Sequence, residues 1–396
     1  MNDLERSSSA SFSISLAALL GIAHAAVDGS AGWMCGVLTQ TLAPAEVGGL
    51  LVLYNVLAFA AQPAFGSFVD RTRCARLAVW LGMLAQVLAL VLLPIHPGLA
   101  VAVAGLGSAI FHVGAGAISL LATPGRAAGI GLFAAPGVLG LAVGAALAMS
   151  GIPVRAVLIA LLGGLGALLI MSKRARADET SAVTTAPARP LHESLRWHDL
   201  LIVCLFAAIA LRSLVWTALN WVVQGEAGPL VLMAACAAAG KVAGGFLADR
   251  FGWRQCAVLG LGASAFLAAC DGSNTIVLCL SAGCLQSATP PTVMGVFERL
   301  PARPGLTVGL SFGLVIALAG VPFAMGIGEE LLDSWVRVLM LVGAAMLSWL
   351  CLTPRLLTAT REWAKPPITK GSGFISRIRN VCRFSSSDSP ARWRQS

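Results

Sequence analysis

The sequence is poor in charge. Only 11% of its 396 residues are Asp, Glu, Lys or Arg, against about a quarter in an ordinary soluble domain. Hydrophobic residues make up 57%, and the mean hydropathy is +0.84. A soluble fold of this length cannot hide so much apolar surface, because most of its residues must still meet water. The same composition excludes a disordered chain and a disulfide-rich secreted domain, so a polytopic membrane protein remains.

The short motifs of common enzyme and metal sites are also missing. The chain has no G-x-x-x-x-G-K-[ST] loop for ATP and no H-E-x-x-H helix. Its ten cysteines are scattered and form no C-x-x-C pair or Cys/His cluster, so we interpret them as packing residues. We therefore expect no enzymatic activity, no cofactor and no resident metal, and an ion gradient as the energy source for any transport.

Long apolar runs fill most of the chain. A helix needs roughly 20 apolar residues to cross a bilayer, and these runs are too long and too apolar for the alternating strands of outer-membrane barrels. They predict an all-α polytopic membrane protein. The twelve expected transmembrane helices cover residues 13–41, 46–65, 77–94, 98–121, 128–150, 154–171, 199–223, 229–247, 255–270, 275–296, 306–327 and 335–353.

Basic residues fall in alternate breaks between these runs. With the N-terminus placed in the cytoplasm, most of the 27 Lys and Arg lie in breaks on that side, and Glu46, Glu226 and Asp271 lie in breaks on the other. Both termini are then cytoplasmic. The tail, residues 354–396, carries most of the net charge of +9. The positive-inside bias and anionic lipid account for that charge, so we expect no nucleic-acid partner.

The chain divides into two similar halves. The expected parts are a cytoplasmic N-terminal segment (1–12), a six-helix half (13–171), a cytoplasmic linker (172–198), a second six-helix half (199–353) and a basic cytoplasmic tail (354–396). Both halves carry small-residue ladders in their fifth spans, which let helix backbones approach closely. Duplicated six-helix units that rock about a midplane site are typical of secondary transporters.

A G-x-x-x-D-R motif occurs at the cytoplasmic end of the second span in each half. Its aspartates, Asp70 and Asp249, are placed to face the N-terminus of a neighbouring helix or an adjacent arginine. Such a contact can hold one conformation and release in another, although a charged loop that only sets the topology is the alternative. The predicted gating residues are Gly66, Asp70, Arg71, Gly245, Asp249 and Arg250.

Ionisable and polar residues interrupt the first, fourth, seventh and tenth spans, whereas the third, sixth and ninth are nearly all apolar. An ionisable group inside a bilayer is costly, so each one is a functional candidate. Asp28, His112 and Arg212 each lie about 20 Å from the start of their span at 1.5 Å per residue, near the midplane, and can reach one cavity. The candidates are His24 and Asp28, Ser108 and His112, Arg212 and Asn220, and Gln286.

Asp28 is the candidate for proton coupling. A carboxylate in a partly dry interior can exchange a proton near neutral pH, and His24, one turn away on the same face, and His112 can relay it. Two alternatives for Asp28 are a fixed ion pair with Arg212 and direct contact with the substrate. For the two histidines, the alternative is a hydrogen bond to a neighbouring helix.

Arg212 is the candidate substrate anchor. It stays charged and offers a planar fork to a carboxylate, phosphate or phosphonate, and Asn220, Ser108 and Gln286 are the further candidate contacts. The alternatives for Arg212 are the pair with Asp28 and helix packing. Lys241 lies one turn before the second motif, so we expect its side chain to snorkel to the cytoplasmic face.

Two resemblances follow from these motifs. Gly245–Arg254 reads G-F-L-A-D-R-F-G-W-R and resembles the loop motif of the major facilitator superfamily, of which Gly66–Arg71 is a degenerate copy. That resemblance implies a cavity lined by spans 1, 4, 7 and 10. The His24/Asp28 pair and the run Gly105–His112 resemble the fosmidomycin-resistance branch of drug exporters. After His112 this chain has Val-Gly, where that branch has proline and an acid.

The sequence thus predicts a multi-pass transporter in a bacterial inner (cytoplasmic) membrane, working as a monomer. We expect a proton-coupled antiporter that exports a small polar or anionic compound or drug and confers resistance to it. Its partners are the small-molecule substrate, protons and the lipid bilayer. Three alternatives remain open: proton-coupled uptake of a small solute, export of a divalent metal ion with His24, Asp28 and His112 as ligands, and a non-transporting membrane sensor or regulator.

Overall fold

The computed structural model describes residues 3–175, 195–223, 226–270, 274–326 and 328–353, and in these ranges every regular element is helical. The predicted linker lies largely, and the predicted tail entirely, outside the described residues. The elements are α1 (Asp3–Thr41), α2 (Pro44–Asn55), η1 (Val56–Ala60), α3 (Gln62–Thr72), α4 (Ala75–Leu92), α5 (Pro97–Ala122), α6 (Ala127–Met149), α7 (Val154–Ala175), α8 (Leu195–Val223), α9 (Ala227–Phe251), α10 (Trp253–Cys270), α11 (Thr275–Ser287), α12 (Thr289–Phe297), α13 (Pro304–Val308), η2 (Gly309–Leu314), α14 (Val315–Ala324), η3 (Gly328–Leu332) and α15 (Ser334–Cys351).

The prediction of an all-α membrane protein is confirmed. Eleven helices in the described ranges are long and apolar enough to cross a bilayer, and α7 adds the shorter apolar stretch Val154–Leu165. Together they match the twelve predicted spans, with boundaries that differ by up to seven residues, most at the end of the second span, which was predicted as 46–65 and is observed as Pro44–Thr72. Large apolar side chains such as Ile159 and Leu259, each 70% exposed, cover the outer surface, as a bilayer requires.

Three spans are built from more than one helical segment. The second is α2, η1 and α3; the tenth is α11 and α12; the eleventh is α13, η2 and α14. Pro290 and Pro291 start α12, since proline lacks the N–H that would continue α11 but fits the first helical turn. Pro63 starts α3 in the same way, just after the π-helical turn η1. A π turn adds a residue to the helix and is common at functional positions.

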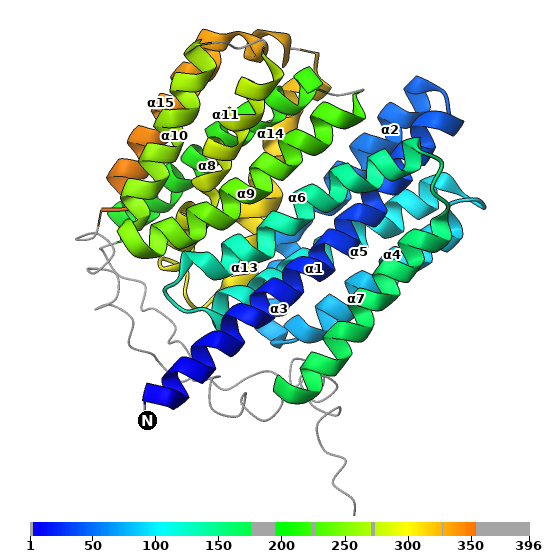
Figure 1. The fold of residues 1–396 in the computed structure, drawn as a ribbon, viewed down its shortest axis with the longest axis horizontal. Helices are drawn as coiled ribbons and strands as arrows, with labels where there is room; N and C mark the ends of the chain where they lie inside the picture. Colours follow the sequence, from blue (N-terminus) through cyan, green and yellow to red (C-terminus); the bar gives the residue numbers. More distant parts are fainter. Residues whose placement is uncertain (1–2, 176–194, 224–225, 271–273, 327, 354–396) are drawn as a thin grey trace, which may run out of the picture.

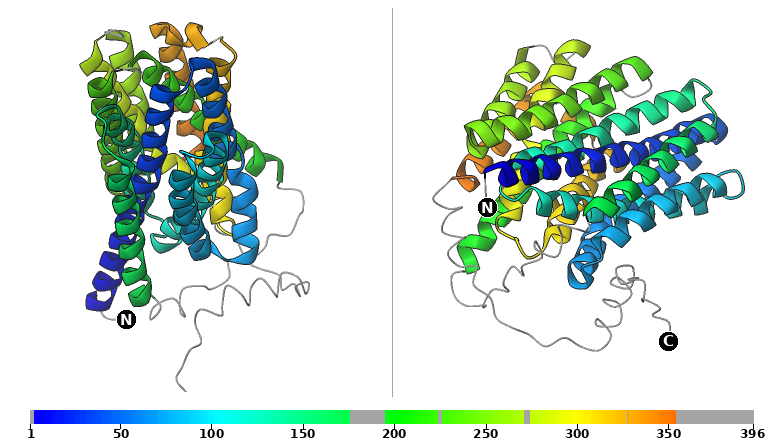
Figure 2. Two further views of the ribbon diagram at one scale, coloured as in Figure 1. Left: turned by 90° about the vertical axis from the view of Figure 1, so that its right-hand side faces the viewer. Right: turned by 60° about the horizontal axis from the view of Figure 1, so that its bottom comes forward.

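The two predicted halves lie side by side, with α1–α7 on one side and α8–α15 on the other (Figures 1 and 2). Within the first half, α1 runs along α6, and glycines of both helices meet. A Cβ atom added at Gly144 would lie 2.0 Å from the carbonyl oxygen of Gly29, so nothing larger fits while the backbones stay in place. This close contact matches the small-residue ladder predicted for the fifth span.

The halves meet chiefly where α6 packs against α9 and where α3 and α5 pack against α13. Between α3 and α13 a Cβ atom on Gly66 would lie 2.3 Å from the carbonyl oxygen of Gly305, and between α9 and α6 a Cβ atom on Gly245 would lie 2.8 Å from Cα of Ala128. The motif glycines therefore permit backbone contact between the halves. Along the same seam the π turns η1 and η2 also contact one another.

Candidate proton and substrate site

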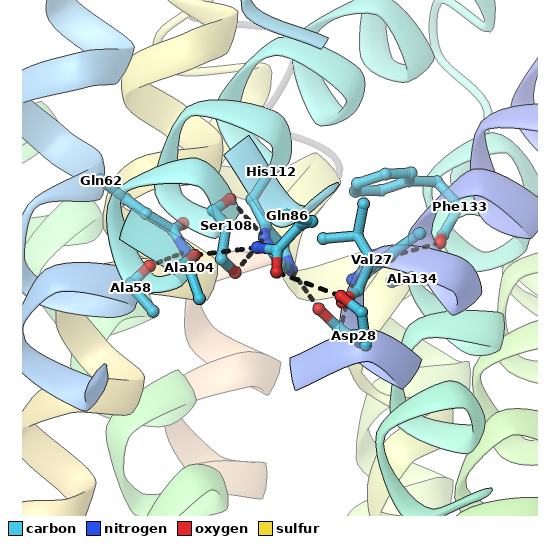
Figure 3. A network of polar contacts seen from close by, with 12 residues as sticks. Val27, Asp28, Ala58, Gln62, Gln86, Ala104, Ser108, His112, Phe133 and Ala134 are labelled. Atoms are coloured by element: carbon cyan, nitrogen blue, oxygen red, sulfur yellow. Dashed lines mark hydrogen bonds and ion pairs between the residues drawn. The ribbon is translucent and has the colours of Figure 1, made fainter. Parts of the chain in front are cut away.

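Asp28 on α1 lies between two imidazoles. Its Oδ2 is 3.0 Å from Nε2 of His24, one turn away on the same helix, and its Oδ1 is 3.6 Å from Nε2 of His112 on α5. The two rings stand edge to face with centroids 4.5 Å apart. Figure 3 shows Asp28 and His112 pointing toward each other from their two helices. Both histidines are 6% exposed, while the Asp28 side chain is 16% exposed, so this carboxylate is the more accessible group.

In both imidazoles the ring nitrogen that faces away from Asp28, Nδ1, has a fixed hydrogen-bond partner, which determines where the ring carries its proton. Nδ1 of His24 is 2.9 Å from the carbonyl oxygen of Phe133, and Nδ1 of His112 is 2.7 Å from that of Ser108. A carbonyl oxygen only accepts hydrogen bonds, so both Nδ1 atoms must carry the proton. In a neutral ring Nε2 is then a lone pair, and it would face the carboxylate of Asp28. A proton or a metal ion is therefore required between the imidazoles and the carboxylate, and the proton can be on Nε2 or on the carboxyl group of Asp28.

These three residues also form a donor set for a metal ion. One ligand atom from each of His24, Asp28 and His112 lies within 4.8 Å of the others. Two imidazoles and a carboxylate suit a divalent transition metal, and imidazole ligands commonly donate their other N–H to a backbone carbonyl, as both do here. The geometry is therefore compatible with either kind of cation.

A buried glutamine braces the helices that carry this site. Oε1 of Gln86, on α4, accepts a hydrogen bond from Oγ of Ser30 at 3.1 Å, and its Nε2 donates to the carbonyl oxygen of Ala104 at 2.8 Å. The side chain thus ties α4 to α1 and α5 close to Asp28 (Figure 3). The sequence pattern does not distinguish Gln86 as a site residue, because it is one polar residue in an otherwise apolar span.

Arg212, on α8, is 4% exposed and lies in the other half. Its Nη1 donates to Oε1 of Gln286 on α11 at 2.9 Å, and the hydroxyl of Thr289 donates to the same oxygen at 2.8 Å. Nε of Arg212 is buried without a hydrogen-bond partner. Among the described residues no carboxylate lies within ion-pair distance of Arg212, and Asp28 pairs with the histidines instead. The structure therefore does not contain the Asp28–Arg212 ion pair considered above.

Two other candidate contacts are differently placed. Ser108 lies beside His112, with its hydroxyl oxygen 3.2 Å from Nδ1 of that ring, so it belongs to the cation site. Asn220 donates to the carbonyl oxygen of Trp216, one turn earlier on its own helix, at 2.8 Å. The amide of Asn220 is thus engaged with α8, and no hydrogen bond joins it to Arg212.

Lys241 on α9 differs from the prediction. Its ammonium donates to the carbonyl oxygen of Ala134 at 3.3 Å, which places it against α6, one residue beyond the carbonyl that holds His24. The side chain therefore turns inward and does not snorkel to the cytoplasmic face, because α6 packs against this part of α9 and offers an acceptor there.

The two motif aspartates bind helix N-termini in opposite halves. Asp70 accepts hydrogen bonds from the N–H groups of Gly305 and Leu306 at the start of α13, both at 2.8 Å. Asp249 accepts them from Ala127 at 2.6 Å and Ala128 at 3.1 Å, at the start of α6. Each half thus supplies the acid that caps a helix of the other.

The arginines of the motifs take a smaller part in these contacts. Arg126, which precedes α6, places its Nε 3.8 Å from Asp249 and adds a partly exposed ion pair. Arg71 is solvent-exposed, and Arg250 lies over the ring of Phe251 at 5.5 Å from its centroid. The contact between the halves therefore rests on the aspartates and glycines of the motifs.

Comparison with known proteins supports the fold. No protein-family model and no curated protein sequence matches the chain. Among solved structures it is similar to the E. coli fucose:proton symporter, with a TM-score of 0.56 and 13% identity over 85% of this chain and 98% of that one. A second structure of that symporter, a major facilitator superfamily transporter in the outward conformation, gives a TM-score of 0.55 at 14% identity and covers 89% of this chain and 98% of that one.

A bacterial homologue of the iron transporter ferroportin, in its outward-facing state, is similar to the same degree. Its TM-score is 0.55 at 13% identity, over 88% of this chain and 99% of that one. These likenesses show that the chain has the major facilitator fold. The narrower resemblance to fosmidomycin-resistance exporters stays a prediction.

Proposed function

We propose that this protein is a proton-coupled secondary transporter that moves a small polar or anionic molecule across the membrane by alternating access. The observation that carries the proposal is the Asp28 site, where two imidazoles with committed Nδ1 protons face one carboxylate and demand a cation. A buried, partly accessible site of this kind can take up and release a proton. The major facilitator fold provides the two rocking halves.

The contacts of the motif aspartates suggest how the cycle is gated. Asp70 and Asp249 hold the halves together at the end where the basic breaks lie, which the positive-inside bias assigns to the cytoplasm. We interpret this arrangement as the outward-facing state, closed on the cytoplasmic side. Each aspartate would have to leave its helix N-terminus before that side opens. Two charge-assisted contacts of this kind bias the equilibrium without locking it.

The resemblance to fosmidomycin-resistance exporters favours export by proton antiport. It also favours a monomer in the bacterial inner membrane. Uptake is the second candidate, because a proton added near Arg212 makes the interior more positive and attracts an anion, so proton and anion would move together. Both candidates use the same residues. They differ in whether the proton and the substrate cross the membrane in opposite directions or in the same direction, which transport measurements can determine.

The test uses a bacterial host that lacks its own exporters and measures accumulation of labelled fosmidomycin, a phosphonate, with and without a protonophore. Low accumulation that rises when the proton gradient collapses supports antiport, whereas high accumulation that the protonophore abolishes supports uptake. Asp28→Asn, which cannot exchange the proton, should remove either effect while the protein stays in the membrane. Unchanged transport in Asp28→Asn would contradict proton coupling at this site.

Export of a divalent metal ion is the alternative that the donor set of Asp28 and the histidines keeps open. Growth of the same host on rising zinc, nickel or cobalt separates it from the main proposal. If the protein raises metal tolerance, and His112→Ala abolishes that tolerance, metal export replaces proton coupling. If tolerance equals that of the empty vector, export of these three ions is excluded and proton coupling remains the proposal.

A further inference from the structure

The second half of the protein contains a buried arginine and a half-buried lysine that form no ion pair with any described carboxylate. Arg212 is 4% exposed, its Nε has no hydrogen-bond partner, and its Nη1 is bound by a neutral amide oxygen of Gln286. Lys241, the second cation, donates to a backbone carbonyl. Among the described residues no carboxylate forms an ion pair with either cation, and Asp28 is engaged by two imidazoles. Uncompensated charges in a low-dielectric interior are costly.

The two cations belong to one region at the seam between the halves. A Cβ atom added at Gly131 of α6 would lie 2.7 Å from the backbone oxygen of Lys241 and 3.2 Å from Cγ of Pro290, so α9 and the start of α12 meet at the same point of α6. Thr289, the neighbour of Pro290, shares its acceptor Gln286 with Arg212. Lys241 and the residues that hold Arg212 therefore border the same part of α6.

We propose that Arg212 and Lys241 form an anion-binding site that takes the substrate through a carboxylate, phosphate or phosphonate group. The inference rests on the proposed transport function and names the class of its substrate. Arg212 supplies a planar fork of donors and Lys241 a compact charge that can turn toward the ligand from its carbonyl partner. Gln286 acts as a positioning residue, because its amide oxygen holds the guanidinium while Thr289 holds the amide.

The position of Lys241 gives the site a link to the cation site. Its ammonium rests on α6 one residue from the carbonyl that orients His24, although Lys241 belongs to the other half. An anion that draws Lys241 away from Ala134 would remove a hydrogen bond between the halves. Substrate binding and the contact of α9 with α6 are thereby coupled through one side chain.

The experiment uses the full chain, purified in lipid nanodiscs, and two probes of similar shape. Methylphosphonate is an anion at neutral pH, whereas dimethyl methylphosphonate is its neutral ester. Thermal unfolding is followed by tryptophan fluorescence at rising probe concentration and constant ionic strength. We expect a saturable rise of the unfolding midpoint with methylphosphonate and none with the ester. An equal response to both probes would overturn the site, and this comparison needs no variant.

Variants then assign the site to its residues. Lys241→Gln and Arg212→Gln should each weaken the apparent affinity about 10- to 100-fold, as expected for loss of a charge-assisted hydrogen bond. Lys241→Arg, which keeps the charge, should stay within a few-fold of the native protein. Arg155→Gln removes an exposed cation at the start of α7 and is the matched control. Native affinity in Lys241→Gln, or equal loss in Arg155→Gln, would overturn the proposal.

Failure of the site can be told apart from failure of the proposed function. In proteoliposomes with an imposed proton gradient, movement of a neutral solute without any effect of methylphosphonate would leave the transporter and remove the anion site. Saturable binding of methylphosphonate with no gradient-driven transport of any probe would leave the anion site and remove the transport function. The two measurements use the same preparation of protein.

Discussion

Gly137 on α6 provides the space in which the ring of His24 lies, and its replacement by alanine is the sharpest test of the Asp28 site. A Cβ atom at this position would lie 2.2 Å from Nε2 of His24, with the two ring carbons beside it at 2.4 and 2.5 Å. Ordinary contacts begin at 3.4 Å, so the ring must withdraw by about 1 Å or more. It then loses the contact with Asp28 and the hydrogen bond to Phe133.

The expected cost follows from these two contacts. A hydrogen bond to a charged group is worth about 1.5–3 kcal/mol and a neutral one about 1 kcal/mol, while replacing glycine by alanine in a helix returns about 1 kcal/mol. The balance is a loss of about 2 kcal/mol in the free energy of unfolding. The same loss corresponds to a factor of about 30 in the binding of the cation that His24 supports.

The assay is equilibrium unfolding of the purified protein in mixed micelles of detergent and SDS. Gly262→Ala is the control, because a Cβ atom at Gly262 has no neighbour within 4 Å, and its stability should stay equal or rise. In a His24→Ala background Gly137→Ala should cost little, since the atom with which it collides is gone. An undiminished loss in that background, or no loss in the single variant, would refute the role assigned to Gly137.

Three further changes test other contacts. Asp70→Asn combined with Asp249→Asn should weaken closure of the cytoplasmic side by about 1–2 kcal/mol for each residue, and spin-label distances across the seam should then show a larger inward-open fraction; an unchanged distribution would contradict the gate. Gln286→Ala should lower the free energy of unfolding in SDS by about 1–3 kcal/mol, because a buried arginine loses its acceptor; native stability would show another group holding it. Gln86→Leu should cost about 1 kcal/mol for each hydrogen bond that ties α4 to α1 and α5, while the hydroxyl of Ser30 keeps the carbonyl oxygen of Val27 as its acceptor, and a loss below about 0.5 kcal/mol would remove the bracing role of Gln86.

The spans were predictable because a bilayer imposes one requirement on all of them. About 20 apolar residues are needed for each crossing, and proline and basic residues mark the ends, so the predicted boundaries differ from the observed ones by no more than seven residues. The π turns η1 and η2 left no such signal. Pro63 is a local hint for the first, because the N–H that its ring replaces would have bonded to the turn before it.

The partners of the candidate residues were less predictable than their depths. Spacing alone places His24 and Asp28 on one face of α1, since they are one turn apart. Whether His112 or Arg212 then meets Asp28 depends on how the helices are rotated against each other, which the pattern of one span does not contain. Lys241 was misplaced for the same reason: its distance from the helix end favours the surface, but the carbonyl of Ala134 on α6 accepts its proton inside.

The exchange of helix caps between the halves has a consequence for the order in which the chain is assembled. During synthesis Asp70 enters the membrane long before the N-terminus of α13 at Gly305 has been made. Likewise, the N–H groups of Ala127 and Ala128 have no acceptor at this position until Asp249 has been made. The first half is thus made with one acid and one helix end unsatisfied. We expect it to reach its final packing only after α9 and α13 have entered the membrane, so the two halves mature together and not in succession.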